Sequence, residues 1–130
     1  MREILFRGKR LDNGAWETGS LVIVRMDCHD AQYYIADKMT GYHTPVDPST
    51  VGQYTGLTDK NGKRIFDGDV AKVLQGKDKD IAYVGFENGA FMLYPKTGNV
   101  YERTLWEYWY NDWDVEVVGN ITDNPELLEK

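Results

Sequence analysis

The sequence has one cysteine, two histidines and no long apolar run. The shortage of cysteine argues against a disulfide-bonded protein, and the lack of a long apolar run argues against a membrane-spanning one. Cys28 has no second cysteine with which to form a disulfide, so a reducing compartment is expected. Residues 1–10 hold no apolar stretch long enough for a signal peptide or a membrane span. We therefore expect a soluble cytoplasmic protein with no membrane partner.

Excess negative charge is missing from most of the chain and is confined to its C-terminal end. Residues 1–101 balance acidic against basic side chains, so the whole net charge of −6 lies in residues 102–130. An acidic pole repels phosphate backbones at long range. This distribution argues against nucleic acid as a general partner.

The sequence does hold enough apolar material for a core, with 42% hydrophobic and 13% aromatic residues. Aromatic side chains bring large apolar areas that disordered chains lack. The length fits a single domain over residues 1–130. Residues 43–50 contain two prolines, which do not suit a central strand, and could separate subdomains of residues 1–42 and 51–130.

Turn signals and alternating apolar residues predict a mainly β fold. Segments rich in Gly and Asn predict turns at residues 12–14, 60–63, 87–89 and 97–99. The expected strands are residues 4–8, 15–25, 32–36, 51–57, 70–74, 81–86, 90–94 and 115–121. They favour a small antiparallel SH3-like barrel around residues 51–94 or packed sheets. A short C-terminal helical turn is expected where Asn124 can cap and Pro125 suits the first position.

Residues 99–113 break the β pattern, because their apolar residues recur at helical intervals and predict one amphipathic helix. On a helical wheel the apolar arc covers roughly 200°, against the narrower stripe of a typical surface helix. The arc contains Tyr101, Leu105, Trp106, Tyr108, Trp109, Tyr110 and Trp113. We expect Tyr101, Leu105 and Trp109 to anchor the helix. Trp106 and Tyr110 then face either a second element of this chain or another subunit.

Three stretches of the sequence resemble a known family. They are MREILFRGKRLDNGAWETGSLV, VDPSTVGQYTGLTDKNGKRIFDGDVAKV and DVEVVGNITDNPELL. Together they are similar to the YopX-like proteins of bacterial phages and prophages. The resemblance implies a phage or prophage origin, a largely β fold with a barrel-like part, and no established biochemical activity. It supplies no catalytic residues.

Two groups of residues suggest metal binding, and both fall short of a ligand set. Asp67 and Asp69 could together hold a hard cation, but a turn is favoured because no third and fourth oxygen donor accompanies them. Residues 27–30 join Cys28 and His29 to two aspartates, which suggests a transition metal or a nucleophile pair. His43 is the only other histidine, so a solvated loop is favoured. We expect no metal or cofactor.

Basic residues provide an alternative function. Arg7, Lys9, Arg10, Lys60, Lys63, Arg64, Lys72, Lys77 and Lys79 could share one face of a small barrel. With Tyr54 and Phe66 between them, they could form a platform for single-stranded nucleic acid. The alternative interpretation is that these basic side chains only keep hairpin turns and strand edges solvated.

No phosphate-binding loop, dinucleotide fingerprint, nucleophile elbow or paired-histidine motif is present, so no motif argues for an enzyme. An unrecognised hydrolytic or nucleotide-directed enzyme stays open as a further alternative. We expect a phage or prophage accessory protein that is not an enzyme. It would act as a protein-interaction module, forming a homo-oligomer through Trp106 and Tyr110 and engaging a host or phage protein.

Overall fold

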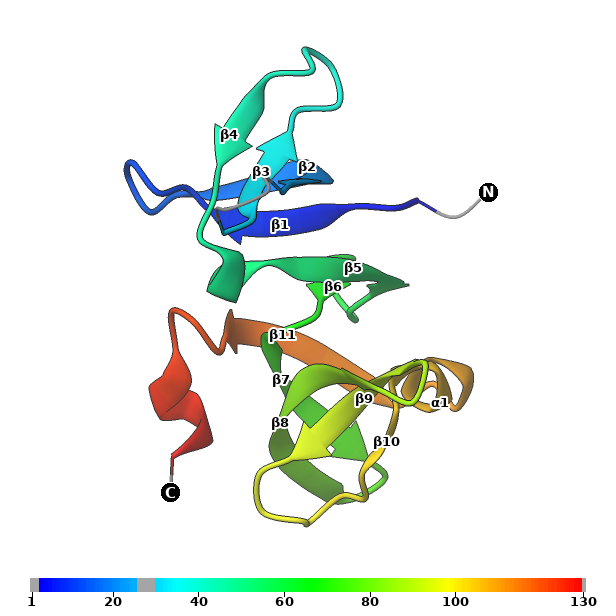
Figure 1. The fold of residues 1–130 in the computed structure, drawn as a ribbon. Helices are drawn as coiled ribbons and strands as arrows, with labels where there is room; N and C mark the ends of the chain where they lie inside the picture. Colours follow the sequence, from blue (N-terminus) through cyan, green and yellow to red (C-terminus); the bar gives the residue numbers. More distant parts are fainter. Residues whose placement is uncertain (1–2, 26–29, 130) are drawn as a thin grey trace. The chain divides into compact units, whose positions relative to one another are not determined.

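The structure is a computed structural model that describes residues 3–25 and 30–129 (Figure 1). The chain divides into two compact units, one ending at Tyr54 and the other beginning at Thr55. The described strands form two antiparallel sheets and are accompanied by one α-helix, which confirms the mainly β prediction. Neither sheet closes on itself within the described residues, so the fold is mainly β without a closed barrel in that part of the chain.

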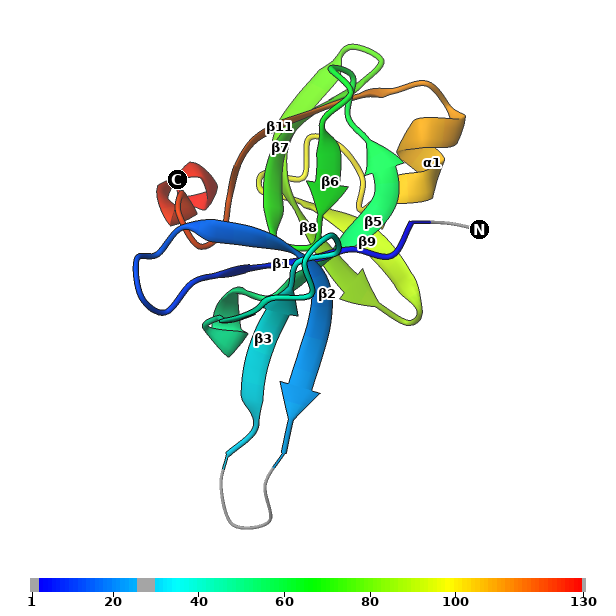
Figure 2. The same cartoon turned by 90° about the horizontal axis from the view of Figure 1, so that it is seen from above.

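The first unit is an antiparallel sheet with the strand order β4-β3-β2-β1, continued by the start of β5. Its elements are β1 (Phe6–Lys9), β2 (Trp16–Val24), β3 (Gln32–Ala36), β4 (His43–Pro45), the 3-10 helix η1 (Pro48–Thr50) and the first residues of β5 (Gly52–Thr58). Figure 2 shows β2 and β3 side by side, paired from Ser20↔Ala36 to Val24↔Gln32.

Close packing in the first unit depends on Gly19. A Cβ atom at this position would lie 2.2 Å from the carbonyl oxygen of Ala36 on the neighbouring strand β3. That oxygen belongs to the backbone, so any side chain here would force the two strands apart. Ile35 and Val46 are both 1% exposed and form the centre of this unit's core.

The second unit contains a five-stranded antiparallel sheet with the order β10-β9-β8-β7-β11, and β6 beside the end of β5 (Figure 1). Its elements are β6 (Arg64–Phe66), β7 (Asp69–Gln75), β8 (Asp78–Glu87), β9 (Ala90–Pro95), β10 (Arg103–Thr104), α1 (Leu105–Tyr110), β11 (Asp114–Asn120) and the 3-10 helix η2 (Pro125–Leu128). Asn88 and Gly89 connect β8 to β9 with φ of 53° and 83°. Two positive φ values are typical of the type I′ turn that suits a two-residue hairpin.

Alternation along the strands separates a core face from an outward face in this sheet. Ala71 and Val73 of β7 are fully buried, whereas Lys72 between them is exposed. Ala82 and Val84 of β8 join them on the core face, and Leu105 and Tyr108 of α1 belong to the same apolar cluster. The short helix therefore completes the core of the second unit.

The helix predicted over residues 99–113 is much shorter, because both of its flanks have other partners. Before it, Arg103 and Thr104 pair with Leu93 and Met92 as β10. After it, Asp112 takes the left-handed conformation with φ of 57°, which ends the helix. The predicted C-terminal turn is present as η2 with Asn124 at its N-cap position, but the Asn124 side chain makes no capping hydrogen bond. The Asn124 carboxamide oxygen instead accepts the backbone N–H of Asn120 at 3.2 Å.

Candidate functional site

A side-chain cap by Thr104 at the start of α1 sets the direction in which its side chains point. The backbone of Thr104 is extended, and its hydroxyl accepts the N–H of Glu107 at 3.2 Å. The Glu107 carboxylate accepts a bond from the Thr104 hydroxyl and forms an ion pair with Arg103 at 2.9 Å. The Arg103 hydrogen bond is the main reason why the pKa of Glu107 lies below its ordinary value. The helix thus starts at a fixed residue despite its length.

The inward side of α1 consists of Leu105 and Tyr108, which are 2% and 0% exposed. The Tyr108 ring meets Trp113 edge to face, with 5.3 Å between ring centroids. Its hydroxyl has no hydrogen-bond partner among the described residues. Burial raises the pKa of Tyr108, so the phenol stays neutral. Leu105 and Tyr108 hold the helix in place.

The outward side of α1 carries Trp106, Trp109 and Tyr110, which we call the aromatic surface. These side chains are 56%, 60% and 68% exposed, and Tyr101, which precedes the helix in the chain, is 72% exposed. The rings of Trp106 and Tyr110 stack with centroids 4.9 Å apart and planes 20° from parallel. Tyr101 and Trp109 were expected to anchor the helix, and that assignment was wrong because the wheel assumed a helix of fifteen residues. Trp106 and Tyr110 are exposed within the described structure.

Charged groups border the aromatic surface, and most of them are acidic. Asp112 and Asp114 follow the helix, are exposed, and line one pocket with Trp109. Arg103 is the basic group here, with its guanidinium 5.8 Å from the Tyr101 ring centroid and 5.4 Å from that of Trp113. The ion pair with Glu107 already neutralises much of its charge. The surface is therefore apolar and aromatic with an acidic border.

The pair Asp67 and Asp69 forms a turn, as favoured from the sequence. Asp69 is 1% exposed, and its carboxylate accepts the backbone N–H of Phe66 at 2.8 Å. Gly68 between the aspartates has φ of 91°, a conformation that side chains disfavour. Within residues 3–25 and 30–129, no group of three or more His, Cys, Asp or Glu side chains is placed to hold a metal ion.

The cluster at residues 27–30 is only partly described, since Asp27, Cys28 and His29 lie outside the described residues. Asp30 is exposed. His43, the other histidine, has contacts of its own. Its Nδ1 lies 2.8 Å from the Gly41 carbonyl oxygen, and its ring meets that of Tyr34 edge to face.

The basic residues of the first unit have local partners. The guanidinium of Arg7 and the ammonium of Lys9 lie 4.7 and 5.6 Å from the Trp16 ring centroid. Arg10 forms ion pairs with Asp12 at 2.8 Å and Glu17 at 3.1 Å. The remaining basic residues named from the sequence, from Lys60 to Lys79, belong to the second unit.

The aromatic residues expected to form a nucleic-acid platform do not offer exposed ring faces. Tyr54 and Phe66 are 9% and 7% exposed, and both count among the core residues. Base stacking requires an accessible ring. The predicted platform was therefore wrong in its aromatic members.

Two buried aspartates that sequence reasoning did not select organise the loops of the second unit. Asp59 accepts backbone N–H groups of Asn61, Lys63 and Val117, each at 2.9 Å. Burial raises the pKa of Asp59, but these hydrogen bonds outweigh burial, and the net shift is downward. The signal for Asp59 was local, because an aspartate just before a turn such as Lys60-Asn61-Gly62 commonly accepts the turn's backbone N–H groups.

Asp80 organises residues 97–99 in the same way, by accepting hydrogen bonds from that loop. Its carboxylate accepts the Thr97 hydroxyl at 2.8 Å and the Asn99 N–H at 3.1 Å, besides the N–H groups of Ile81 and Thr97. Burial opposes ionisation, yet the hydrogen bonds prevail and hold the pKa of Asp80 below its ordinary value. No local pattern reveals this contact, because it joins residues about seventeen positions apart.

Comparisons with known proteins agree with the fold. Two solved structures are similar to the chain: protein EF1440 from Enterococcus faecalis and protein yopX from Bacillus subtilis. Their TM-scores are 0.60 and 0.59, and each is 21% identical. The first alignment covers 99% of this chain and 100% of EF1440, and the second covers 96% of this chain and 98% of yopX.

A search of curated proteins finds no match. No helix among the described residues has the length and apolar character needed to cross a membrane. The family described as YopX protein matches residues 5–129, which is nearly the whole chain. The chain therefore belongs to the YopX protein family.

Proposed function

We propose that the protein is a protein-interaction module of phage or prophage origin, and that the aromatic surface of α1 pairs with the same surface of a second copy. The main support for this proposal is that Trp106, Trp109 and Tyr110 are exposed on a six-residue helix whose other side is buried. Trp and Tyr are enriched at the centres of protein interfaces, where they bring large contact areas with few rotatable bonds.

The helix is suited to recognition because its aromatic side chains are held before any partner arrives. The Thr104 cap fixes its first turn, and Leu105 and Tyr108 fix its rotation about its axis. The stack between Trp106 and Tyr110 further limits the rotamers of both rings. Side chains that are already ordered lose less entropy on binding.

A second copy fits this surface because a twofold pairing would bring the same aromatic rings into contact from both sides. Exposed apolar patches on soluble proteins commonly mark such contacts. The acidic border consisting of Asp112 and Asp114 would face its own copy and repel it. Self-association through this surface should therefore strengthen as salt screens the repulsion.

Sedimentation equilibrium from low to high micromolar protein tests the proposal. We expect the wild-type protein to associate with rising concentration, and more strongly at high salt. The double variant Trp106→Glu/Tyr110→Glu should stay monomeric with an unchanged far-ultraviolet circular dichroism spectrum, because neither side chain belongs to the core.

Tyr42→Glu is the matched control, since Tyr42 is 70% exposed but belongs to the first unit. It should associate like the wild-type protein. A wild-type chain that remains monomeric at high micromolar concentration would reject self-association. An oligomer that survives the double substitution would place the interface elsewhere.

We further infer that the protein acts by binding and not by catalysis. The buried carboxylates Asp59, Asp69 and Asp80 each accept backbone N–H groups, which is a structural use of a carboxylate. Carboxylates that donate or accept protons in catalysis need pKa values near the working pH. The pKa values of Asp59 and Asp80 are shifted away from that range.

A further inference from the structure

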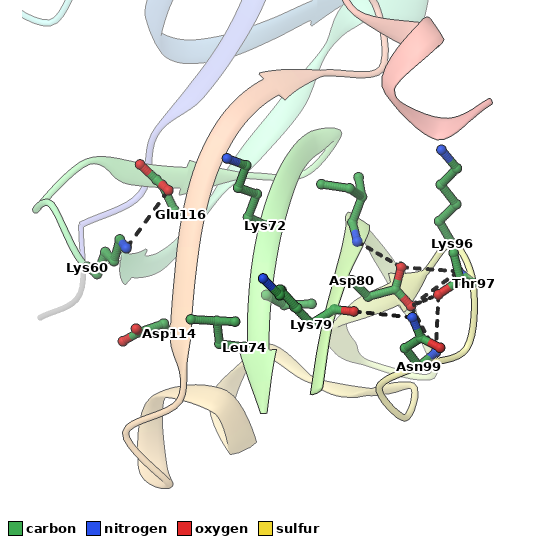
Figure 3. A pocket seen from close by; sticks show the side chains of 12 residues that line it. Lys60, Lys72, Leu74, Lys79, Asp80, Lys96, Thr97, Asn99, Asp114 and Glu116 are labelled. Carbon is green, nitrogen blue, oxygen red and sulfur yellow. Dashed lines mark hydrogen bonds and ion pairs between the residues drawn. The ribbon is translucent and has the colours of Figure 1, made fainter. Parts of the chain in front are cut away.

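The outward face of the sheet formed by β11, β7 and β8 carries a pocket of about 530 Å³, which we call the lysine pocket. Val73 points into the core, so its neighbours Lys72 and Leu74 point outward. Lys72 pairs with Glu116 on β11 and Ile81 on β8. Leu74 pairs with Asp114 and Lys79 in the same way. The register thus places these six side chains on one face (Figure 3).

Four lysines line this pocket: Lys60, Lys72, Lys79 and Lys96. Two of them already have partners in the second unit. Lys60 lies 3.9 Å from the Glu116 carboxylate, and Lys96 Nζ donates to the Leu127 carbonyl oxygen at 3.4 Å. Lys72 and Lys79 form no ion pair with any described residue. Their two positive charges are available to a ligand.

The four lysines of the pocket outnumber its three carboxylates, which belong to Asp80, Asp114 and Glu116. Glu116 forms the ion pair with Lys60, and the Asp80 carboxylate accepts hydrogen bonds from Thr97, Asn99 and Ile81 (Figure 3). Asp114 lies across Leu74 from Lys79, two strands away, which is about 10 Å at the usual spacing. Strand spacing therefore separates Asp114 from Lys79 at the level of the backbone, whereas Lys72 has Glu116 directly opposite and Asp114 as a diagonal neighbour.

Lys72 and Lys79 are diagonal neighbours on adjacent strands, because Lys72 pairs with Ile81 and Lys79 lies two residues before it. Diagonal neighbours in an antiparallel pair have Cα atoms about 7–8 Å apart, within reach of long side chains. Their ammonium groups can therefore converge on one anion. Leu74 and Ile81 are half-buried between them and give the pocket an apolar floor.

We propose that the lysine pocket binds a phosphorylated small molecule, with the phosphate at Lys72 and Lys79 and the apolar part over Leu74 and Ile81. The volume lies within the range of about 300–1,000 Å³ that is usual for small-molecule sites. Asp80 fixes residues 97–99, so this wall of the pocket is formed before binding. A compact ligand is favoured over a nucleic acid because the net charge of −6 repels a long phosphate backbone.

Titration of the 15N-labelled full chain at physiological salt tests this site. Inorganic pyrophosphate should shift the backbone amide signals of Lys72, Leu74, Lys79 and Ile81 in a saturable manner. ADP should bind several-fold more tightly than pyrophosphate, because its ring can cover the apolar floor. Adenosine, which lacks phosphate, should bind at least about tenfold more weakly than ADP, since it makes no charge-assisted hydrogen bonds to the lysines.

The double variant Lys72→Gln/Lys79→Gln should bind pyrophosphate about tenfold more weakly. Lys77→Gln is the matched control, because Lys77 lies in the turn between the same strands but does not line the pocket. It should bind like the wild-type chain. Gln keeps most of the length of Lys, and the unliganded spectra will show whether each variant is folded.

Three results would overturn the proposal. One is the absence of saturable shifts with pyrophosphate up to millimolar concentration. Another is equal binding by the double variant and the wild-type chain, which would place the anion elsewhere. The third is tighter binding of a single-stranded oligonucleotide than of ADP, which would assign the lysines to nucleic acid. If ADP binds no more tightly than pyrophosphate, the apolar floor has no part in recognition and the proposal fails in that respect.

Discussion

The two sides of helix α1 have similar compositions and opposite surroundings. The inward side presents Leu105 and Tyr108, which are buried, while the outward side presents Trp106, Trp109 and Tyr110, which are more than half exposed. Large apolar residues of the same kinds therefore serve stability on one side and remain available for contact on the other. An aromatic cluster in a sequence does not by itself indicate a core.

The second unit repeats this division in its sheet. Ala71 and Val73 on β7 face the core, and Lys72 and Leu74 face the lysine pocket. Apolar contacts and hydrogen bonds to buried aspartates hold the inward side in place. The outward side includes lysines that form no ion pair with any described residue. We therefore expect inward substitutions to lower stability and outward substitutions to change binding.

Removal of the Tyr108 ring should have the largest effect on folding. Tyr108→Ala is expected to lower the free energy of unfolding by about 3–5 kcal/mol, because a fully buried aromatic ring leaves a cavity. Denaturation by urea, followed by far-ultraviolet circular dichroism, measures this change.

Tyr108→Phe is the control that separates the ring from its hydroxyl. The hydroxyl has no hydrogen-bond partner among the described residues, so its removal should change stability by less than about 0.5 kcal/mol or increase it. If Tyr108→Phe were as destabilising as Tyr108→Ala, the hydroxyl would have to make a buried hydrogen bond, contrary to this structure.

Asp80→Asn should cost about 1–3 kcal/mol, because the partly buried hydrogen bonds of the loop lose an ionised acceptor. Amide hydrogen exchange at Thr97 and Asn99 should accelerate in the same variant. Asp78→Asn is the matched control, since Asp78 is exposed on the same strand. Equal stability of the two variants would show that Asp80 does not hold the loop.

The same carboxylates predict how stability depends on pH. The pKa values of Asp59 and Asp80 are lower in the folded chain than their ordinary value of about 3.9. Their contribution is therefore fully present above that value and is lost as the pH falls through the folded pKa values. Unfolding by urea at stepped pH should show a smaller acid-induced loss in Asp59→Asn/Asp80→Asn than in the wild type. Parallel curves would contradict this account.

The smallest effect on folding is expected on the outward side. Tyr110→Ala should lower the stability of the monomer by less than about 1 kcal/mol, since the side chain is 68% exposed and contacts mainly Trp106. Urea denaturation at low protein concentration isolates the monomer. A loss as large as that of Tyr108→Ala would show that the two sides of α1 do not differ.

Much of the fold could be predicted because its signals are local. Apolar alternation predicted residues 70–74 as a strand, and β7 spans Asp69–Gln75. The Asn88-Gly89 turn was readable from two adjacent residues. The Thr104 and Glu107 spacing was an equally local signal for the start of α1, and the sequence interpretation overlooked it.

The remainder depends on contacts between distant residues. Arg103 leaves the predicted helix because β9 offers it a pairing partner, which apolar spacing within residues 99–113 does not reveal. The lysine pocket requires the register of β7 against β8 before Lys72 and Lys79 become neighbours. Lys96, another lining residue, was absent from the predicted basic set for the same reason.

Hydroxyl-radical footprinting of the tryptophans as a function of protein concentration tests the central claim most directly. We predict that Trp106 and Trp109 oxidise rapidly at low concentration and become protected as the chain associates. Trp113 packs against the core and should show a constant, lower rate. If Trp106 and Trp109 were protected at every concentration, they would belong to the core. If they stayed reactive while the chain associated, another surface would form the interface.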